Sequence, residues 1–274
     1  MLAGNFLQVN DMANTTAPMN RLNQLFAAKN ENLLSIYFTA GYPELNTTVD
    51  IAEALEKAGA DFLEIGFPYS DPVADGPTIQ HSSQTALDNG MNLNILFAQL
   101  KALRSRVSIP VLLMGYVNPI VQYGVERFCK DAAAAGVDGI IVPDLPMYEY
   151  EMLYSNYFEE NNLSNIFLVT PQTSLERIRK IDGLSNSFIY LLSSSSITGG
   201  KLQLNDSIES YYSRIKAMEL NNPAIIGFGI SDHKSFIKAC EYANGAIVGS
   251  AFVKLLGEEN YMEKISAFIK EIKG

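Results

Sequence analysis

The feature that most constrains this chain is an alternation of short apolar runs with longer helical patterns, which recurs eight times. The runs are almost continuously apolar, as is typical of parallel strands covered on both faces. The predicted strands span residues 33–39, 61–67, 111–116, 139–143, 165–170, 188–193, 224–228 and 246–249. The predicted helices span residues 47–58, 79–88, 93–103, 125–135, 148–160, 175–181, 208–218, 233–242, 252–256 and 261–272.

This alternation predicts an α/β fold. Parallel strands need crossover connections, and the helical patterns supply them. Eight units in 274 residues, with no second domain, favour a closed (β/α)8 TIM barrel, with a doubly wound open sheet as the alternative. We expect one catalytic barrel domain over residues 19–274. Residues 1–18 contain no Lys or Arg and fit no targeting signal, so we expect a disordered N-terminal extension ahead of Met19.

Composition and charge exclude several classes of protein. With 47% apolar and 10% aromatic residues, the chain can bury enough surface to fold, which excludes disorder as its main state. The net charge of -10 is opposite to the basic field of a nucleic-acid binder. No apolar run reaches the ~18 residues of a membrane span. Cys129 and Cys240 lie in separate helical patterns without a nearby Cys or His, so we expect two buried, reduced thiols in a cytosolic protein.

Glu64 interrupts an otherwise apolar predicted strand. Alternation along the strand puts Phe62, Glu64 and Gly66 on one face. The opposite face is the more apolar one and should pack against the helices, so Glu64 should point into the mouth of the barrel. Burying a carboxylate is costly, and inward carboxylates near strand ends are candidates for acid–base chemistry; a core ion pair is the structural alternative.

Two more carboxylates lie in the loop that follows this strand. Asp71 and Asp75 belong to residues 68–77 (PYSDPVADGP), where three prolines restrict the backbone. A stiff loop can hold both side chains at the barrel mouth, although Asp-Pro and Asp-Gly are also ordinary turn pairs. From residue types alone, Asp75 can be either a site residue or a turn residue, whereas Asp71 is better explained as a turn residue. Carboxylates in different settings can divide acid and base roles.

Glycines follow the last three predicted strands, at residues 198–200 (TGG), 227–231 (GFGIS) and 249–250 (GS). Barrels frequently bind phosphate at the loops after strands seven and eight, through backbone N–H groups and helix N-termini. Such a site needs no Lys or Arg, which suits an anionic ligand on an acidic chain. No lysine ends a predicted strand, which is unfavourable for a Schiff-base aldolase, and His81 and His233 lie in separate helical patterns unsuited to a shared metal.

Several motifs, in order and spacing, resemble the tryptophan synthase α subunit family from about Met19 to the C-terminus. The most specific is residues 63–80 (LEIGFPYSDPVADGPTIQ). The others are residues 38–43 (FTAGYP), 114–119 (MGYVNP), 142–146 (VPDLP), 190–193 (YLLS) with 197–199 (ITG), and 227–231 (GFGIS).

The resemblance implies a lyase of tryptophan biosynthesis, which cleaves indole-3-glycerol phosphate to indole and glyceraldehyde 3-phosphate. No metal or cofactor is implied in this chain. Indole would pass to a β subunit within a cytoplasmic α2β2 heterotetramer, where pyridoxal phosphate joins it to serine. The loops near Asp71 and after Asn118 would face that subunit. A free-standing indole-releasing lyase, another phosphosugar barrel enzyme and a non-catalytic activating subunit remain the alternatives.

The resemblance also assigns site residues. Glu64 matches the catalytic glutamate, which would move protons between the glycerol hydroxyl and the ring carbon, and Asp75 matches the aspartate that holds the indole N–H. The implied substrate-binding residues are Tyr37, Met114, Tyr190 and Thr198. The implied phosphate-binding residues are Gly199, Gly229, Gly249 and Ser250. One departure is residues 194–200 (SSSITGG), where many members carry Arg-Ala-Gly before Val-Thr-Gly, so we expect altered loop closure.

Overall fold

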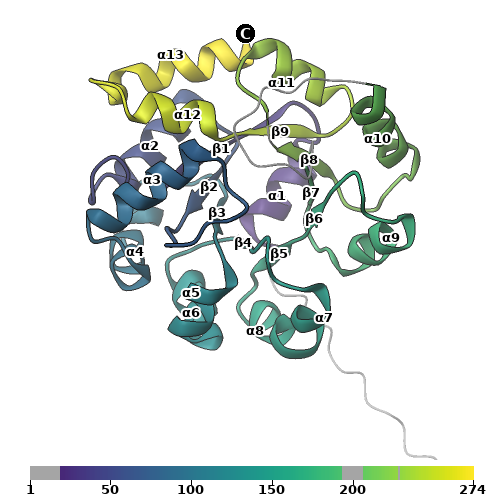
Figure 1. Ribbon diagram of the computed structural model, residues 1–274, viewed down its shortest axis with the longest axis horizontal. Helices are drawn as coiled ribbons and strands as arrows, with labels where there is room; N and C mark the ends of the chain where they lie inside the picture. Colours follow the sequence, from purple (N-terminus) through teal and green to yellow (C-terminus); the bar gives the residue numbers. More distant parts are fainter. Residues whose placement is uncertain (1–18, 193–205, 228) are drawn as a thin grey trace, which may run out of the picture.

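The computed structural model describes residues 19–192, 206–227 and 229–274. Their parallel strands form a ring, with helices around its outside (Figure 1). The strands are β1 (Leu33–Thr39), β2 (Phe62–Gly66), β3 (Val111–Met114), β4 (Gly139–Ile141), β5 (Ser164–Ile166), β6 (Leu168–Val169), β7 (Ile189–Leu192), β8 (Ala224–Gly227) and β9 (Gly245–Val248). The predicted N-terminal extension lies outside the described residues.

The strand order is β5-β4-β3-β2-β1-β9-β8-β7-β6, and every pairing is parallel. The two ends of this order, β5 and β6, are consecutive parts of one predicted strand, divided at Phe167. The carbonyl of Phe167 still accepts the N–H of Tyr190 at 2.9 Å, so the stretch joins both edges of the sheet. The barrel prediction is therefore confirmed, and the open sheet is wrong. The eight predicted strands become nine because the fifth is interrupted.

Helices connect the strands and cover the outside of the sheet. They are α1 (Arg21–Ala28), α2 (Thr48–Ala58), α3 (Pro77–Asp88), α4 (Leu93–Leu100), η1 (Leu103–Ser105), α5 (Val117–Tyr123), α6 (Val125–Ala134), α7 (Met147–Glu149), η2 (Tyr150–Tyr154), α8 (Ser155–Glu160), α9 (Leu175–Leu184), α10 (Asp206–Ala217), α11 (His233–Cys240), α12 (Ser250–Leu256) and α13 (Tyr261–Lys273). Within the described residues, no helix is both long enough and apolar enough to span a bilayer.

Side-chain alternation along the strands divides the core into two layers. Phe62 belongs to an inner cluster inside the barrel, whereas its neighbours Leu63 and Ile65 belong to the outer cluster between strands and helices. The inner cluster consists of Leu22, Leu33, Phe62, Leu112, Ile141, Ile166, Phe188, Tyr190, Ile225 and Ile247. The barrel interior is thus a packed core, as expected of this fold.

Helix α1 is seen through the middle of the ring in Figure 1 and lies at the amino ends of the strands, where Asn20 donates from Nδ2 to the carbonyl of Asp138 at 3.1 Å. Asn20 caps it by accepting the N–H of Asn23 at 3.0 Å. Leu22 is fully buried in the inner cluster, and the ring of Phe26 lies 5.6 Å from that of Phe188. The sequence pattern did not predict α1, because a helix of eight residues before the first strand has no crossover to mark it.

The packing of α1 predicts a large stability effect for a single truncation. Leu22→Ala should lower the free energy of unfolding by about 2–5 kcal/mol, because it leaves a cavity in the inner cluster. Urea unfolding followed by circular dichroism measures this. Gln24→Ala, on the exposed face of the same helix, should change stability by less than about 0.5 kcal/mol. Equal effects of both substitutions would contradict the packing role of α1.

The other differences between the structure and the predictions from the sequence each concern a few residues. Helix α5 was not among the predicted helices; Pro119 lies in its first turn, where proline is tolerated. The predicted helix over 148–160 is divided into α7, η2 and α8 by a π-helical turn. Cys129 is buried as predicted, whereas Cys240 is only half-buried.

Candidate active site

A cavity of about 260 Å³ opens at the carboxyl ends of the strands, where barrel enzymes place their chemistry. Three predicted site residues, Tyr37, Asp75 and Met114, line it. The other lining residues are mainly apolar or aromatic: Phe67, Tyr69, Pro72, Val73, Ala74, Ile79, Ser83, Gly115, Tyr116, Pro143, Leu168, Thr170 and Leu192. An apolar wall with a few polar groups is typical of a small-molecule site.

Glu64 lies on the inner face of β2 and is not among the residues that line this cavity. In the register of β1 and β2 it pairs with Tyr37, and across β3 it pairs with Leu112. Its side chain is fully buried, and neither carboxylate oxygen has a hydrogen-bond partner among the described residues. Burial raises the pKa of Glu64 from its ordinary value near 4.5 to about 8. The carboxyl group is therefore protonated at neutral pH.

Two tyrosines lie beside Glu64 on the inner face. Tyr37 and Tyr190 each lie over a glycine of the neighbouring strand, since a methyl group on Gly66 would lie 2.2 Å from the Tyr37 hydroxyl and one on Gly227 would lie 2.1 Å from that of Tyr190. Burial, with the nearby carboxyls of Asp75 and Glu64 as further causes, raises the pKa of both phenols. Both tyrosines are neutral at physiological pH.

Asp75 is held at the cavity wall by a tyrosine that sequence reasoning did not assign. The Tyr116 hydroxyl donates to Asp75 Oδ2 at 3.1 Å and accepts the N–H of Ala74 at 3.0 Å, so it fixes both loop residues. Burial raises the pKa of Asp75 to about 6, which the hydrogen bond from Tyr116 partly opposes. The position of Tyr116 two residues past the end of β3 was the available signal. Asp71, in contrast, is exposed, where Ser70 donates a hydrogen bond to it.

The predicted phosphate corner is described only in part. Gly229 has a φ of 79°, a left-handed conformation that favours glycine, in the loop after β8. Gly249 joins β9 to α12, close to Tyr37, and Ser250 is the first residue of that helix. Gly229, Gly249 and Ser250 thus follow adjacent strands at the same end of the barrel as the cavity. Thr198 and Gly199 lie outside the described residues, as does the stretch 194–200.

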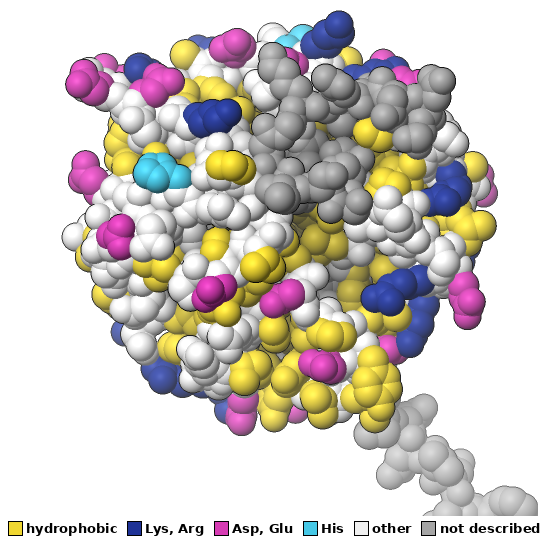
Figure 2. All heavy atoms as spheres, viewed as in Figure 1, with side chains coloured by type: hydrophobic (Ala, Val, Ile, Leu, Met, Phe, Trp, Pro, Cys, Tyr) yellow, Lys and Arg dark blue, Asp and Glu magenta, His cyan; other side chains and the backbone are white. Residues whose placement is uncertain are grey.

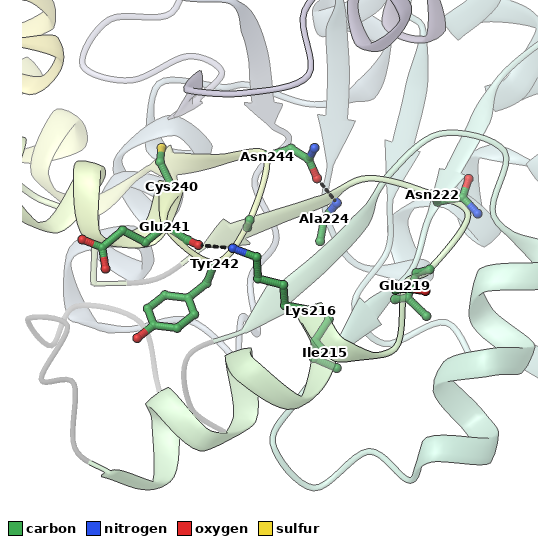
Figure 3. A pocket seen from close by; sticks show the side chains of 11 residues that line it. Ile215, Lys216, Glu219, Asn222, Ala224, Cys240, Glu241, Tyr242 and Asn244 are labelled. Carbon is green, nitrogen blue, oxygen red and sulfur yellow. Dashed lines mark hydrogen bonds between the residues drawn. The ribbon is translucent and has the colours of Figure 1, made fainter.

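A second cavity, of about 270 Å³, lies near the amino ends of β8 and β9 (Figure 3). It contains no predicted site residue. Lys216 donates from Nζ to the carbonyl of Glu241 at 2.8 Å across this cavity, and Cys240 is also in its wall. This end of a barrel usually serves stability, so the first cavity is the better candidate. No group of three or more His, Cys, Asp or Glu side chains suited to a metal occurs among the described residues.

Comparison with known proteins adds to this geometry. The family model described as tryptophan synthase alpha chain matches residues 23–273. The tryptophan synthase alpha chain of Flavobacterium psychrophilum is 54% identical over 93% of this chain and 100% of its own length. That of Bacteroides thetaiotaomicron is 47% identical over 92% of this chain and 99% of its own.

Solved structures agree with the sequence comparisons. The tryptophan synthase subunit alpha of Legionella pneumophila has a TM-score of 0.84 at 32% identity, over 93% of this chain and 97% of that one. A chain of the tryptophan synthase complex of Pyrococcus furiosus has a TM-score of 0.81 at 35% identity, over 89% of this chain and 98% of that one.

Proposed function

This chain belongs to the tryptophan synthase alpha chain family, and on that premise we propose that it cleaves indole-3-glycerol phosphate to indole and glyceraldehyde 3-phosphate. The observation that carries the proposal is Glu64, a buried carboxyl without a hydrogen-bond partner among the described residues, beside an apolar cavity whose wall holds Asp75. The chemistry requires one group that both gives and takes a proton, and a second that stabilises a developing positive charge.

The reaction begins with Glu64 in its protonated form. The indole ring lies in the cavity between Tyr37 and Met114, with its N–H toward the carboxylate of Asp75. Glu64 donates its proton to the ring carbon that bears the glycerol chain, which leaves positive charge at the ring nitrogen. The negative charge of Asp75 stabilises that nitrogen, and Tyr116 holds Asp75 in position.

The second half of the reaction returns the proton. The Glu64 carboxylate takes the proton of the glycerol hydroxyl next to the ring, and that carbon becomes the aldehyde carbon of glyceraldehyde 3-phosphate. The carbon–carbon bond breaks, and its electron pair returns to the ring and neutralises the nitrogen. Glu64 ends protonated, as it began, so the cycle consumes no cofactor. Tyr190 lies beside Glu64 as a neutral phenol near the reacting hydroxyl.

We assign phosphate binding to Gly199, Gly229, Gly249 and Ser250, and substrate contact to Thr198 as well as to the cavity residues. Backbone N–H groups can hold the phosphate without a cation, which suits a chain of net charge -10. A direct assay tests the assignment: the purified chain should release indole from indole-3-glycerol phosphate. Binding of the substrate without turnover would instead favour the non-catalytic alternative, and an isomerised product would favour another phosphosugar barrel enzyme.

The two carboxyl groups predict a bell-shaped pH dependence of kcat/KM. Activity requires Asp75 ionised, so it should be lost as the pH falls through about 6. It also requires Glu64 protonated in the free enzyme, so it should be lost as the pH rises through about 8. Initial rates at low substrate concentration across this range measure both limbs. A profile that rises steadily through the upper pKa would contradict the protonated starting state of Glu64.

We further propose a β subunit as the partner, with pyridoxal phosphate in that subunit. The solved relatives include a chain titled as part of a tryptophan synthase complex. On this chain, apolar side chains gather over the region of α5 to α8 (Figure 2). Val73 is 80% exposed, Tyr148 is 70% exposed and Met152 is 63% exposed, and such exposed apolar groups are typical of an interaction surface. Co-purification with a β subunit, and a faster lyase rate on its addition, test this proposal.

A further inference from the structure

Ser35 is a polar residue on the inner face of β1. Alternation puts it on the same face as Leu33 and Tyr37, which both contact the inner cluster. In the register its neighbours are Phe62 on β2 and Ile247 on β9. The side chain is fully buried, and its hydroxyl has no hydrogen-bond partner among the described residues. An unpaired hydroxyl in an apolar core is destabilising, so its presence there calls for a reason.

Glu64 is the neighbour that can explain why a hydroxyl is buried at Ser35. Both side chains point into the same part of the barrel from adjacent strands, and both have polar atoms without partners among the described residues. The hydroxyl of Ser35 is close enough to lower the pKa of Glu64, against the larger opposite effect of burial. No hydrogen bond joins the two groups in the structure, although they lie on the same inner face of adjacent strands.

We propose that Ser35 is a positioning residue for Glu64, whose hydroxyl donates a hydrogen bond to the carboxylate that exists between the two proton transfers. The proposal rests on the proposed lyase function and deepens it. Once Glu64 has given its proton to the ring carbon, it is an anion in an apolar interior. A hydrogen bond from Ser35 stabilises that anion and orients it toward the glycerol hydroxyl.

Several hydroxyl groups lie around Glu64, and among the described residues Ser35 is the one that lowers the pKa of its carboxyl. The titratable groups that face it are Tyr37 from β1 and Tyr190 from β7, both neutral, while β3 contributes the apolar Leu112. Among the described residues, burial and Ser35 are the causes that shift the pKa of Glu64, and no charged side chain is one of them. Removal of the Ser35 hydroxyl should therefore raise the pKa of the Glu64 carboxyl.

The test replaces Ser35 by Ala, and by the matched pair Thr and Val, which have similar shapes but differ in the hydroxyl. Ser35→Ala and Ser35→Val should move the alkaline limb of kcat/KM upward by about one pH unit and lower kcat at neutral pH by about tenfold. Ser35→Thr should keep the limb of the unsubstituted chain. A purely structural role would lower activity without moving the limb, and an unmoved limb in both Ala and Val variants would overturn the proposal.

A second readout separates this proposal from the lyase assignment. The carboxyl of Glu64 can be titrated directly by infrared difference spectroscopy, with Glu64→Gln to identify its signal. The pKa of Glu64 should rise in Ser35→Ala whether or not the chain turns over substrate. If the unsubstituted chain releases no indole, the lyase assignment fails; if the carboxyl titrates identically with and without the Ser35 hydroxyl, the positioning role fails.

Discussion

Glu64→Gln should abolish indole release, with kcat reduced by about 10³-fold or more, because the amide can neither give a proton to the ring carbon nor take one from the glycerol hydroxyl. The amide has nearly the same shape as the carboxyl, so the inner cluster should stay packed. Steady-state indole release by the purified variant measures the effect. Retention of a tenth or more of the activity would contradict the role of Glu64 in both proton transfers.

The free energy of unfolding of Glu64→Gln, measured against pH, is the control for its loss of activity. The pKa of Glu64 is raised on folding from about 4.5 to about 8. Between these values the folded state keeps a proton that the unfolded state has lost, so the free energy of unfolding falls as the pH rises. Glu64→Gln lacks this titration. Its stability relative to the unsubstituted chain should therefore increase across this range, by a few kcal/mol at the alkaline end, as urea unfolding would measure.

Asp75→Asn should have the second-largest effect. The amide keeps a hydrogen bond to the indole N–H but carries no negative charge, so the positive charge on the ring nitrogen loses its main stabilisation. We expect kcat to fall by about 10²–10³-fold. The acid limb near pH 6 should also disappear, because it reports the ionisation of Asp75. Single-turnover rates of indole formation at several pH values measure both effects.

Asp71→Asn is the matched control for Asp75→Asn. The two carboxylates belong to the same loop, but Asp71 is exposed, and its observed contact is with Ser70. The free chain with Asp71→Asn should keep its lyase rate and its acid limb. Equal losses in both variants would show that the loop charge, rather than a carboxylate placed at the indole nitrogen, is what matters.

The repeated strands were predictable because each is a short, nearly continuous apolar run, and a strand buried on both faces accommodates few polar side chains. The same regularity made Glu64 visible as an exception on the inner face of a strand. Helix α1 was not predictable in this way, because it packs on the inner cluster from the amino end of the barrel and its pattern is that of an ordinary amphipathic helix. The division of the fifth strand at Phe167 depends on how the barrel closes.

The candidate site likewise contains some residues that were predictable from the sequence and some that were not. Glu64 and Asp75 stood out as acidic residues where an apolar or turn residue would serve. Tyr116 and Ser35 did not, because Tyr and Ser are unremarkable in a strand or after one. Their importance comes from the residue that each meets from the neighbouring strand or loop, Asp75 and Glu64 respectively. A sequence pattern describes neighbours along one strand, whereas these contacts join different strands.

The protonation state of Glu64 is the most direct test of the proposed mechanism. Carbon-13 NMR of the Glu-labelled, intact chain can follow its carboxyl signals against pH, and the signal missing in Glu64→Gln belongs to Glu64. If Glu64 starts the reaction as an acid, this signal should remain that of a protonated acid at neutral pH and titrate with a pKa of about 8. A Glu64 signal that ionises near the ordinary value for glutamate would contradict the proposed mechanism.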